Sequence, residues 1–180
     1  MNNLVFAKMK KRDKPQVARI CDKILGVGNA DRLFNYTNST PCRVFVCREN
    51  DLAVVGFARV DIMTAFEANQ VVGHPIFTED IGFLYSIGVH EDFRGRGIAT
   101  KLVELRLDWL LNQNIGSCFT TAWQEGTRIN IEPVISKFGF KKIWEMKNYF
   151  AGENCPRCGD DCKCSAFVFL GKSQKVEVFG

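Results

Sequence analysis

A short glycine-containing turn between a strand and a helix constrains the fold of this chain more than any other feature. Large side chains recur at every second residue from Gly82 to Val89, which predicts a β-strand. After the glycine turn, Phe93-Arg-Gly-Arg-Gly-Ile-Ala99, apolar residues recur at helical spacing to about Asn112. Glycine lets the backbone turn tightly, and the first amides of a helix have no partner within it. The glycine turn therefore predicts a binding site for phosphate, with Arg94 and Arg96 as neighbouring cations.

Length and composition favour a single domain that covers residues 1–180. Of the 180 residues, 46% are apolar and 24% are charged, which is enough for one core and too little for two comfortable domains. The net charge of +4 is too small to predict a nucleic-acid partner. The sequence has neither a run of about 18 apolar residues nor the order of a signal peptide. We therefore expect a cytoplasmic protein that binds no membrane and no nucleic acid, and for which a homodimer is possible.

The rest of the pattern mixes strands and helices. We expect strands at 4–8, 43–48, 52–60, 82–89, 117–123, 140–149 and 165–170, and helices at 15–25, 31–36, 98–112 and 130–138. Asp13 and Pro15 start the first helix, and Asp61 to Asp80 is expected to be a long irregular connection. Alternation along 82–89 places Tyr85 on one face and Gly88 on the other. The class is an α+β (mixed α/β) sheet domain.

Two other phosphate-binding motifs also place glycines between a strand and a helix. A dinucleotide-binding fingerprint needs a third glycine where this chain has Thr100, and a Walker loop needs a Gly-Lys-Ser/Thr ending that is missing here. Both motifs fit poorly. A glycine turn with a purely structural role remains an alternative at this point.

The segment Ile87 to Ala99 resembles motif A of the GNAT superfamily of acyl-CoA-dependent N-acyltransferases. Its Arg/Gln-x-x-Gly-x-Gly/Ala signature is met by Arg94, Gly97 and Ala99, and Gly139-Phe140 matches a recurrent Gly-Phe before a late strand. The resemblance implies a mixed, mostly antiparallel central sheet flanked by helices. It also implies an N-acetyltransferase that moves an acetyl group from acetyl-CoA to a primary amine by direct attack in a ternary complex. A non-catalytic acyl-CoA sensor and a zinc-dependent interaction module are the alternatives.

The resemblance also assigns the residues that bind the coenzyme. Backbone amides of the turn would hold the pyrophosphate, namely those of Arg94, Gly95, Arg96, Gly97, Ile98, Ala99 and Thr100. The strand edge at Ile87 and Val89 would bind the pantetheine arm, and Gly88 fits a bulge or a close backbone approach. A strand amide near Val89 would polarise the thioester carbonyl, and the family's strand distortion makes room for the thioester.

The resemblance also points to candidates for proton transfer. Glu79 and Asp80 are the expected carboxylate bases, because several family members have theirs just before the central strand. The family often places a tyrosine acid where this chain has Ile135. Tyr149 and Tyr85 are the substitute candidates for that proton donor. The coenzyme A thiolate is also a reasonable leaving group without a donor.

A bunched set of cysteines near the C-terminus predicts a metal site. Cys155, Cys158, Cys162 and Cys164 have the spacing C-x2-C-x3-C-x-C. Four thiolates can surround Zn²⁺ and leave no open position, so the zinc would be structural. Free thiols and disulfides are the alternatives. The four isolated cysteines lie in apolar patterns and are expected to be buried free thiols: Cys21, Cys42, Cys47 and Cys118.

Overall fold

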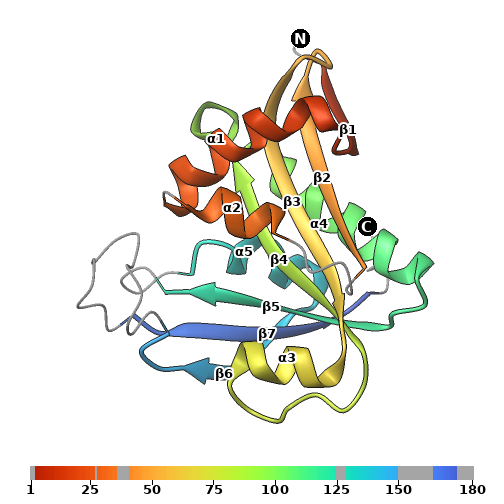
Figure 1. The fold of residues 1–180 in the computed structure, drawn as a ribbon, viewed down its shortest axis with the longest axis vertical. Helices are drawn as coiled ribbons and strands as arrows, with labels where there is room; N and C mark the ends of the chain where they lie inside the picture. Colours follow the sequence, from red (N-terminus) through yellow and green to blue (C-terminus); the bar gives the residue numbers. More distant parts are fainter. Residues whose placement is uncertain (1–2, 27, 36–40, 125–128, 150–163, 174–180) are drawn as a thin grey trace. The chain divides into compact units, whose positions relative to one another are not determined.

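The computed structural model describes residues 3–26, 28–35, 41–124, 129–149 and 164–173 (Figure 1). Its strands are β1 (Leu4–Lys8), β2 (Cys42–Glu49), β3 (Ala53–Met63), β4 (Ile81–Val89), β5 (Ser117–Trp123), β6 (Lys141–Met146) and β7 (Ala166–Lys172). Its helices are α1 (Lys14–Leu25), α2 (Asn29–Phe34), α3 (Ala65–Val72), α4 (Ile98–Asn112) and α5 (Glu132–Ile135). Short 3-10 turns are η1 (Lys11–Asp13), η2 (Glu91–Phe93) and η3 (Ser136–Phe138). The described strands form a mostly antiparallel sheet in the order β1-β2-β3-β4-β5-β7-β6, which confirms the expected fold class.

The chain divides into two compact units, each made of two stretches of sequence. The first unit contains Met1–Asp61 and Leu84–Trp109, and the second contains Ile62–Phe83 and Leu110–Gly180. Strands β3 and β4 and helix α4 each contribute residues to both units. Among the described residues, no helix is both long and apolar enough to cross a membrane.

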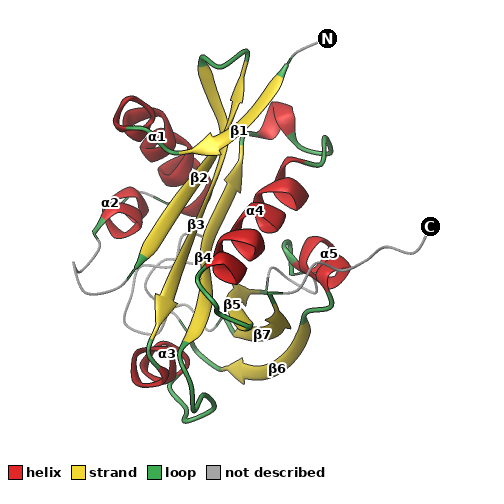
Figure 2. Ribbon diagram, turned by 90° about the vertical axis from the view of Figure 1, so that its right-hand side faces the viewer, coloured by secondary structure: helices red, strands yellow, loops and turns green. Residues whose placement is uncertain are grey.

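The first unit is a three-layer arrangement of helices and strands. Helices α1 and α2 lie on one side of β2 and β3, and α4 lies on the other side (Figure 2). β2 and β3 form the predicted hairpin, whose turn residues Asn50 and Asp51 have φ of 51° and 57°. The core on the α1 side is an apolar cluster that joins the helices to the strands: Val17, Ile20, Cys21, Ala30, Leu33, Val46, Val54 and Phe57.

The start of α1 differs in one detail from the sequence prediction. Pro15 stands in the first turn and Gly26 follows the helix, as expected. Asp13 occupies the cap position, but its carboxylate makes no capping bond to the helix. One carboxylate oxygen accepts from the Lys10 amide at 2.6 Å, and both accept from the buried Arg48 guanidinium at 2.6 and 2.9 Å. The carboxylate therefore ties α1 to β2 instead of capping the helix.

The face occupied by one β4 residue also differs from the prediction. The Tyr85 ring lies 4.7 Å from the guanidinium of Arg59, which bonds to α2, so Tyr85 faces α1 and α2. A Cβ atom on Gly88 would point at the Phe57 ring and the Ile24 side chain, on the same side. Strict alternation would place positions 85 and 88 on opposite sides. The strand is therefore irregular between them, as a bulge makes it.

We expect Gly88→Ala to lower the free energy of unfolding by about 1–3 kcal/mol, the usual cost of overpacking. The added Cβ would lie 2.6 Å from Cε1 of the Phe57 ring, which is too close for any real contact. Urea unfolding measures the loss, and Gly88→Ala combined with Phe57→Leu should recover part of it. Full stability in the single variant would contradict this packing, since alanine is otherwise better than glycine in a strand.

The second unit contains a helix that the sequence analysis missed. Residues 61–80 were expected to be irregular, but they include the end of β3 and helix α3. Thr64 caps α3 by accepting from the Glu67 amide at 3.3 Å, and Glu67 accepts in return from the Thr64 amide at 2.9 Å. This capping box marks the start of the helix. Gly73, with φ of 66°, ends it.

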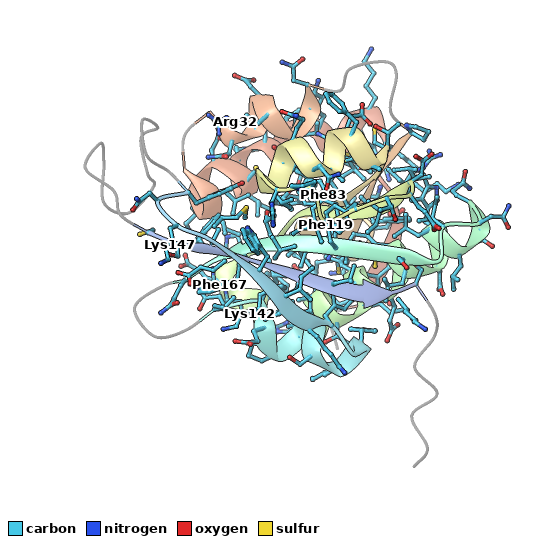
Figure 3. All side chains as sticks on the ribbon, turned by 90° about the horizontal axis from the view of Figure 1, so that it is seen from below. Arg32, Phe83, Phe119, Lys142, Lys147 and Phe167 are labelled. Carbon is cyan, nitrogen blue, oxygen red and sulfur yellow. The ribbon has the colours of Figure 1, made fainter. Side chains whose placement is uncertain are left out.

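Aromatic side chains fill the centre of the second unit. β4 and β5 pair in parallel through Gly82 with Cys118 and Phe83 with Phe119. The rings of Phe83 and Phe119 stack at 4.5 Å (Figure 3). The Phe77 ring lies 4.7 Å from that of Phe119. β5, β7 and β6 form the rest of this half of the sheet by antiparallel pairing.

Several predicted boundaries shift by a few residues. The helix expected at 130–138 is the short α5 followed by η3, and Gly139 ends it in the left-handed conformation. The strand expected at 140–149 ends at Met146, and the short helix expected at 31–36 occupies 29–34. The residues at which helices and strands begin and end depend on tertiary contacts, and a local sequence pattern does not contain these contacts.

Candidate functional site

The glycine turn has the backbone geometry of an anion site. Gly95 and Gly97 have φ of 74° and 76°, a conformation that favours glycine. The Lys101 amide donates to the Gly97 carbonyl at 3.0 Å, so Gly97 stands immediately before the first turn of α4. The amides of residues 98–100 belong to this first turn, where a helix leaves its amides without a partner of its own. The partial positive charge of a 15-residue helix is added at the same place.

The two arginines of the turn fold back onto its backbone. Arg94 Nε donates to the Val89 carbonyl at 3.3 Å, and Arg96 Nη2 donates to the Asp92 carbonyl at 3.0 Å. The Arg96 guanidinium also lies 4.7 Å from the Phe93 ring. These contacts fix the shape of the turn. Each guanidinium has five N–H donors, so a bound phosphate would still find donors on both.

The segment that leads into the turn is tied to the neighbouring elements of the first unit. The His90 amide donates to the Val55 carbonyl of β3 at 2.8 Å. Lys23 of α1 forms an ion pair of 2.6 Å with Glu91, and its hydrogen bond lowers the pKa of the Glu91 carboxyl. The position of the turn is thus set by β3 and α1 as well as by β4.

Comparison with known proteins decides the family. The sequence matches the profile of the acetyltransferase (GNAT) family over residues 13–140. The chain belongs to the GNAT family. No curated protein sequence matches the chain closely enough to count as a relative.

Solved structures share the GNAT fold at low sequence identity. The ribosomal-protein-S18-alanine N-acetyltransferase from Escherichia coli has a TM-score of 0.69 at 13% identity, with 99% of each chain covered. Arabidopsis thaliana NAA60 in complex with a bisubstrate analogue has a TM-score of 0.72 at 13% identity, over 94% of this chain and 98% of that one. The same protein in complex with acetyl-CoA has a TM-score of 0.67 at 13% identity, over 94% and 99%.

Three of the four sequence candidates for proton transfer lie in the second unit, and the fourth, Tyr85, lies in the first. Glu79 and Asp80 are exposed and lie immediately before β4. Tyr149 is 38% exposed, and its amide donates to the Cys164 carbonyl at 3.0 Å. Ile135, at the position where the GNAT family often has a tyrosine, is buried.

Sequence reasoning missed a set of buried charges in the first unit. Arg59 and Asp61 of β3 and Arg106 of α4 are all buried. Arg59 Nε donates to Asp61 Oδ1 at 2.7 Å, and Arg106 Nη1 donates to the Arg59 carbonyl at 3.3 Å. The signal was present in the sequence, because Arg59 and Asp61 interrupt an otherwise apolar strand at a spacing that puts both on one face.

The cysteines are only partly described. Cys21, Cys47 and Cys118 are buried thiols as expected, whereas Cys42 is half-buried. Burial raises the pKa of Cys21 to about 12 and that of Cys47 to about 11, so both remain protonated near neutral pH. Of the predicted zinc ligands, Cys164 is described, and the other three lie outside the described residues: Cys155, Cys158 and Cys162. The described part of the chain contains no cluster of metal-ligating residues, so the zinc site stays a prediction.

Proposed function

We propose that this GNAT protein transfers an acetyl group from acetyl-CoA to a primary amine by direct attack in a ternary complex. The observation that carries the proposal is the glycine turn at the start of α4, with Gly95 and Gly97 in the left-handed conformation. Amides from Arg94 to Thr100 would hold the coenzyme pyrophosphate, because amides at a helix start bind phosphate. A match to the GNAT family over residues 13–140 supports the same assignment.

The end of β4 is the proposed binding site for the pantetheine arm and the thioester. Backbone groups of Ile87 and Val89 would bond to the arm. The break in the alternation of β4 at Gly88, beside which Phe57 packs, supports this role. An amide at this place would stabilise the oxyanion of the tetrahedral intermediate. Removing such a donor typically costs roughly 3 kcal/mol of transition-state stabilisation.

Direct attack needs a neutral amine, so a proton must leave the acceptor. Glu79 and Asp80 are the proposed proton acceptors, and both are exposed to solvent. Asp80 precedes β4 by one residue and Ile87 is well along that strand, so roughly 20 Å of extended backbone separates them. The carboxylates would therefore act through a chain of water molecules. Tyr149 and Tyr85 are the proposed candidates for supplying a proton to the leaving thiolate.

We expect Glu79→Gln and Asp80→Asn to lower kcat by less than roughly tenfold each, because water can replace a remote carboxylate. The thiol-release assay measures the change in kcat and in the amine KM. Glu67→Gln is a control carboxylate, since Glu67 is half-buried and bonds to Thr64 at the start of α3. A loss of several hundredfold in either variant would contradict the water-mediated role and favour direct contact with the amine.

Acetyl-CoA binding and turnover together test the proposed function. Calorimetry should detect acetyl-CoA, and a thiol-release assay with a panel of amines should detect transfer. The panel includes a peptide with a free N-terminal alanine, because a structural neighbour is named for the alanine of ribosomal protein S18. Tight binding without thiol release on any acceptor would favour the non-catalytic sensor. An absence of binding would overturn the assignment.

We also propose that Cys155, Cys158, Cys162 and Cys164 hold a structural zinc ion. The amide of Tyr149 donates to the Cys164 carbonyl at 3.0 Å, so the two ends of the connection that carries the cysteines are already bonded together. A Cys₄ site would close this connection without an open position for catalysis. Mass spectrometry of protein purified without chelator should find one zinc per chain, and its absence would remove the proposal.

A further inference from the structure

A buried arginine in the first unit joins three elements through one side chain. Arg59 of β3 is 7% exposed, and its Nε donates to Asp61 Oδ1 at 2.7 Å. Its Nη1 donates to the carbonyls of Leu33 and Arg32, in the last turn of α2, at 2.9 and 3.2 Å. Its guanidinium lies 4.7 Å from the centre of the Tyr85 ring on β4. The Tyr85 ring is therefore held at a fixed place beside a permanent cation.

Burying this pair of charges costs more free energy than a purely structural contact requires. Taking a guanidinium and a carboxylate out of water costs more than their attraction commonly returns, and an apolar pair of similar size is often as stable. Burial raises the pKa of Asp61 despite the adjacent Arg59, which shows that the carboxylate is strongly desolvated. Buried charges with perturbed titration gather at functional sites. The pair therefore indicates a role for the residue that it holds, and that residue is Tyr85.

Tyr85 is close to the proposed thioester site. It precedes Ile87 by two residues on β4, a separation of roughly 7 Å in an extended strand. It is half-buried and faces the same side of the strand as Gly88.

We infer that Tyr85 is a catalytic residue that donates its hydroxyl proton to the departing coenzyme A thiolate, and that Arg59 is the positioning residue that acts through it. This inference rests on the proposed function. The amine nitrogen forms a bond to the acyl carbon, and the carbon–sulfur bond breaks with its electron pair on sulfur. Sulfur takes the Tyr85 proton, and the phenolate recovers a proton that the new amide nitrogen releases to water. Arg59 stabilises the transient phenolate through its charge.

The test compares Tyr85→Phe with wild type in the thiol-release assay. The variant keeps the ring and its packing and removes only the hydroxyl, so the fold should be unchanged. We expect kcat to fall roughly 10- to 100-fold, at the low end for general acid catalysis because a thiolate leaves readily. The dissociation constant of acetyl-CoA should stay within about twofold. The alkaline fall of the wild-type pH–rate profile, where the phenol loses its proton, should disappear.

Arg59→Lys tests the positioning role. Lysine keeps the charge but lacks the planar fork that bonds Asp61 and α2 together, so kcat should fall by about fivefold to tenfold. In the Tyr85→Phe background the same change should have no further effect on kcat, because Arg59 acts through the hydroxyl. A merely structural Arg59 would give equal losses in both backgrounds and would overturn its assigned role.

Two results would overturn the role of Tyr85 itself. One is a Tyr85→Phe enzyme with wild-type kcat and an unchanged alkaline limb. The other is a larger loss of kcat in Tyr149→Phe than in Tyr85→Phe, which would assign the donor to Tyr149. Wild-type protein that releases no thiol from acetyl-CoA with any amine would instead overturn the proposed function, so the two failures are distinguishable.

Discussion

Gly97→Leu will weaken acetyl-CoA binding by roughly 100-fold while the protein stays folded. Gly97 has φ of 76°, and a Cβ atom placed there would meet no atom of the described chain within 4 Å. The space beside it is open, and under the proposed function the coenzyme phosphate would take it. A leucine side chain would occupy that space and separate the phosphate from the helix amides. Losing about two bonds to a charged group, at roughly 1.5 kcal/mol each, corresponds to a factor of about 100 in the dissociation constant.

Gly139→Leu is the matched control for this prediction. Gly139 has φ of 74°, and a Cβ there would also meet nothing within 4 Å of the described chain. Both variants should lose about 1–2 kcal/mol of stability from the left-handed backbone, measured by urea unfolding. Only Gly97→Leu should lose affinity in calorimetry. Wild-type affinity in Gly97→Leu, or an equal loss in both variants, would show that the coenzyme does not bind at the glycine turn.

The glycine turn was predictable because its information is local. The strand before it, the two glycines and the apolar stripe of the helix after it all lie within residues 82–112. The structure has β4, both positive-φ glycines and α4 in the predicted places. Likewise, the hairpin of β2 and β3 depends on a turn tripeptide and two adjacent β-rich runs. Local steric and hydrogen-bonding preferences suffice for such units.

Other parts of the fold depend on contacts that a single sequence does not display. Helix α3 has little apolar periodicity, and its clearest signal is the capping box of Thr64 and Glu67 inside a stretch that looks irregular. The irregularity of β4 between Tyr85 and Gly88 depends on Phe57 and Ile24, which occupy the space beside the glycine. Alternation alone assumes a regular strand, so it assigned Gly88 to the wrong face.

The proton-carrying residues were hard to predict for the same reason. The sequence offered carboxylates by their position before β4, whereas the Arg59 contact with Tyr85 joins neighbouring strands. Asp61 and Arg59 stand out only as charges within an apolar run. Their pairing, burial and contact with α2 appear once the strands and helices are packed. A site assembled from several elements is therefore less visible in the sequence than one formed by a single turn.

Arg48→Met will lower the free energy of unfolding at pH 7 by roughly 3–5 kcal/mol, the cost of leaving a buried charge without its partner. Arg48 is 1% exposed and bonds both oxygens of the buried Asp13 carboxylate. A third contact, 3.3 Å to Asp51, reaches the turn between β2 and β3. Urea unfolding measures the loss. A loss below about 1 kcal/mol would mean that water reaches Asp13 in the variant.

The double variant Asp13→Leu with Arg48→Met distinguishes two causes of the lost stability: the missing attraction between the two charges, and the cost of a buried Asp13 carboxylate without a partner. Removing both charges removes the need to solvate either one, so the double variant should be more stable than Arg48→Met alone. The hydrogen bond from the Lys10 amide to Asp13 is lost as well, which keeps the double variant below wild type. Equal stability of the single and double variants would show that the unpaired buried carboxylate is not the cause of the loss.

The pH dependence of the same loss follows from the titration of Asp13. Burial by itself raises the pKa of this carboxyl, but hydrogen bonds from Arg48 and the Lys10 amide outweigh burial and hold the pKa below its ordinary value of 3.8. A lowered folded-state pKa contributes stability that is fully present above about pH 5 and is lost as the pH falls through that pKa. Without Arg48 the buried carboxylate takes up a proton more readily, and a neutral Asp13 no longer needs a cation. The stability difference between wild type and Arg48→Met should therefore shrink as the pH is lowered from 7 toward 4. A difference that stays constant over this range would show that the charge of Asp13 is not its cause.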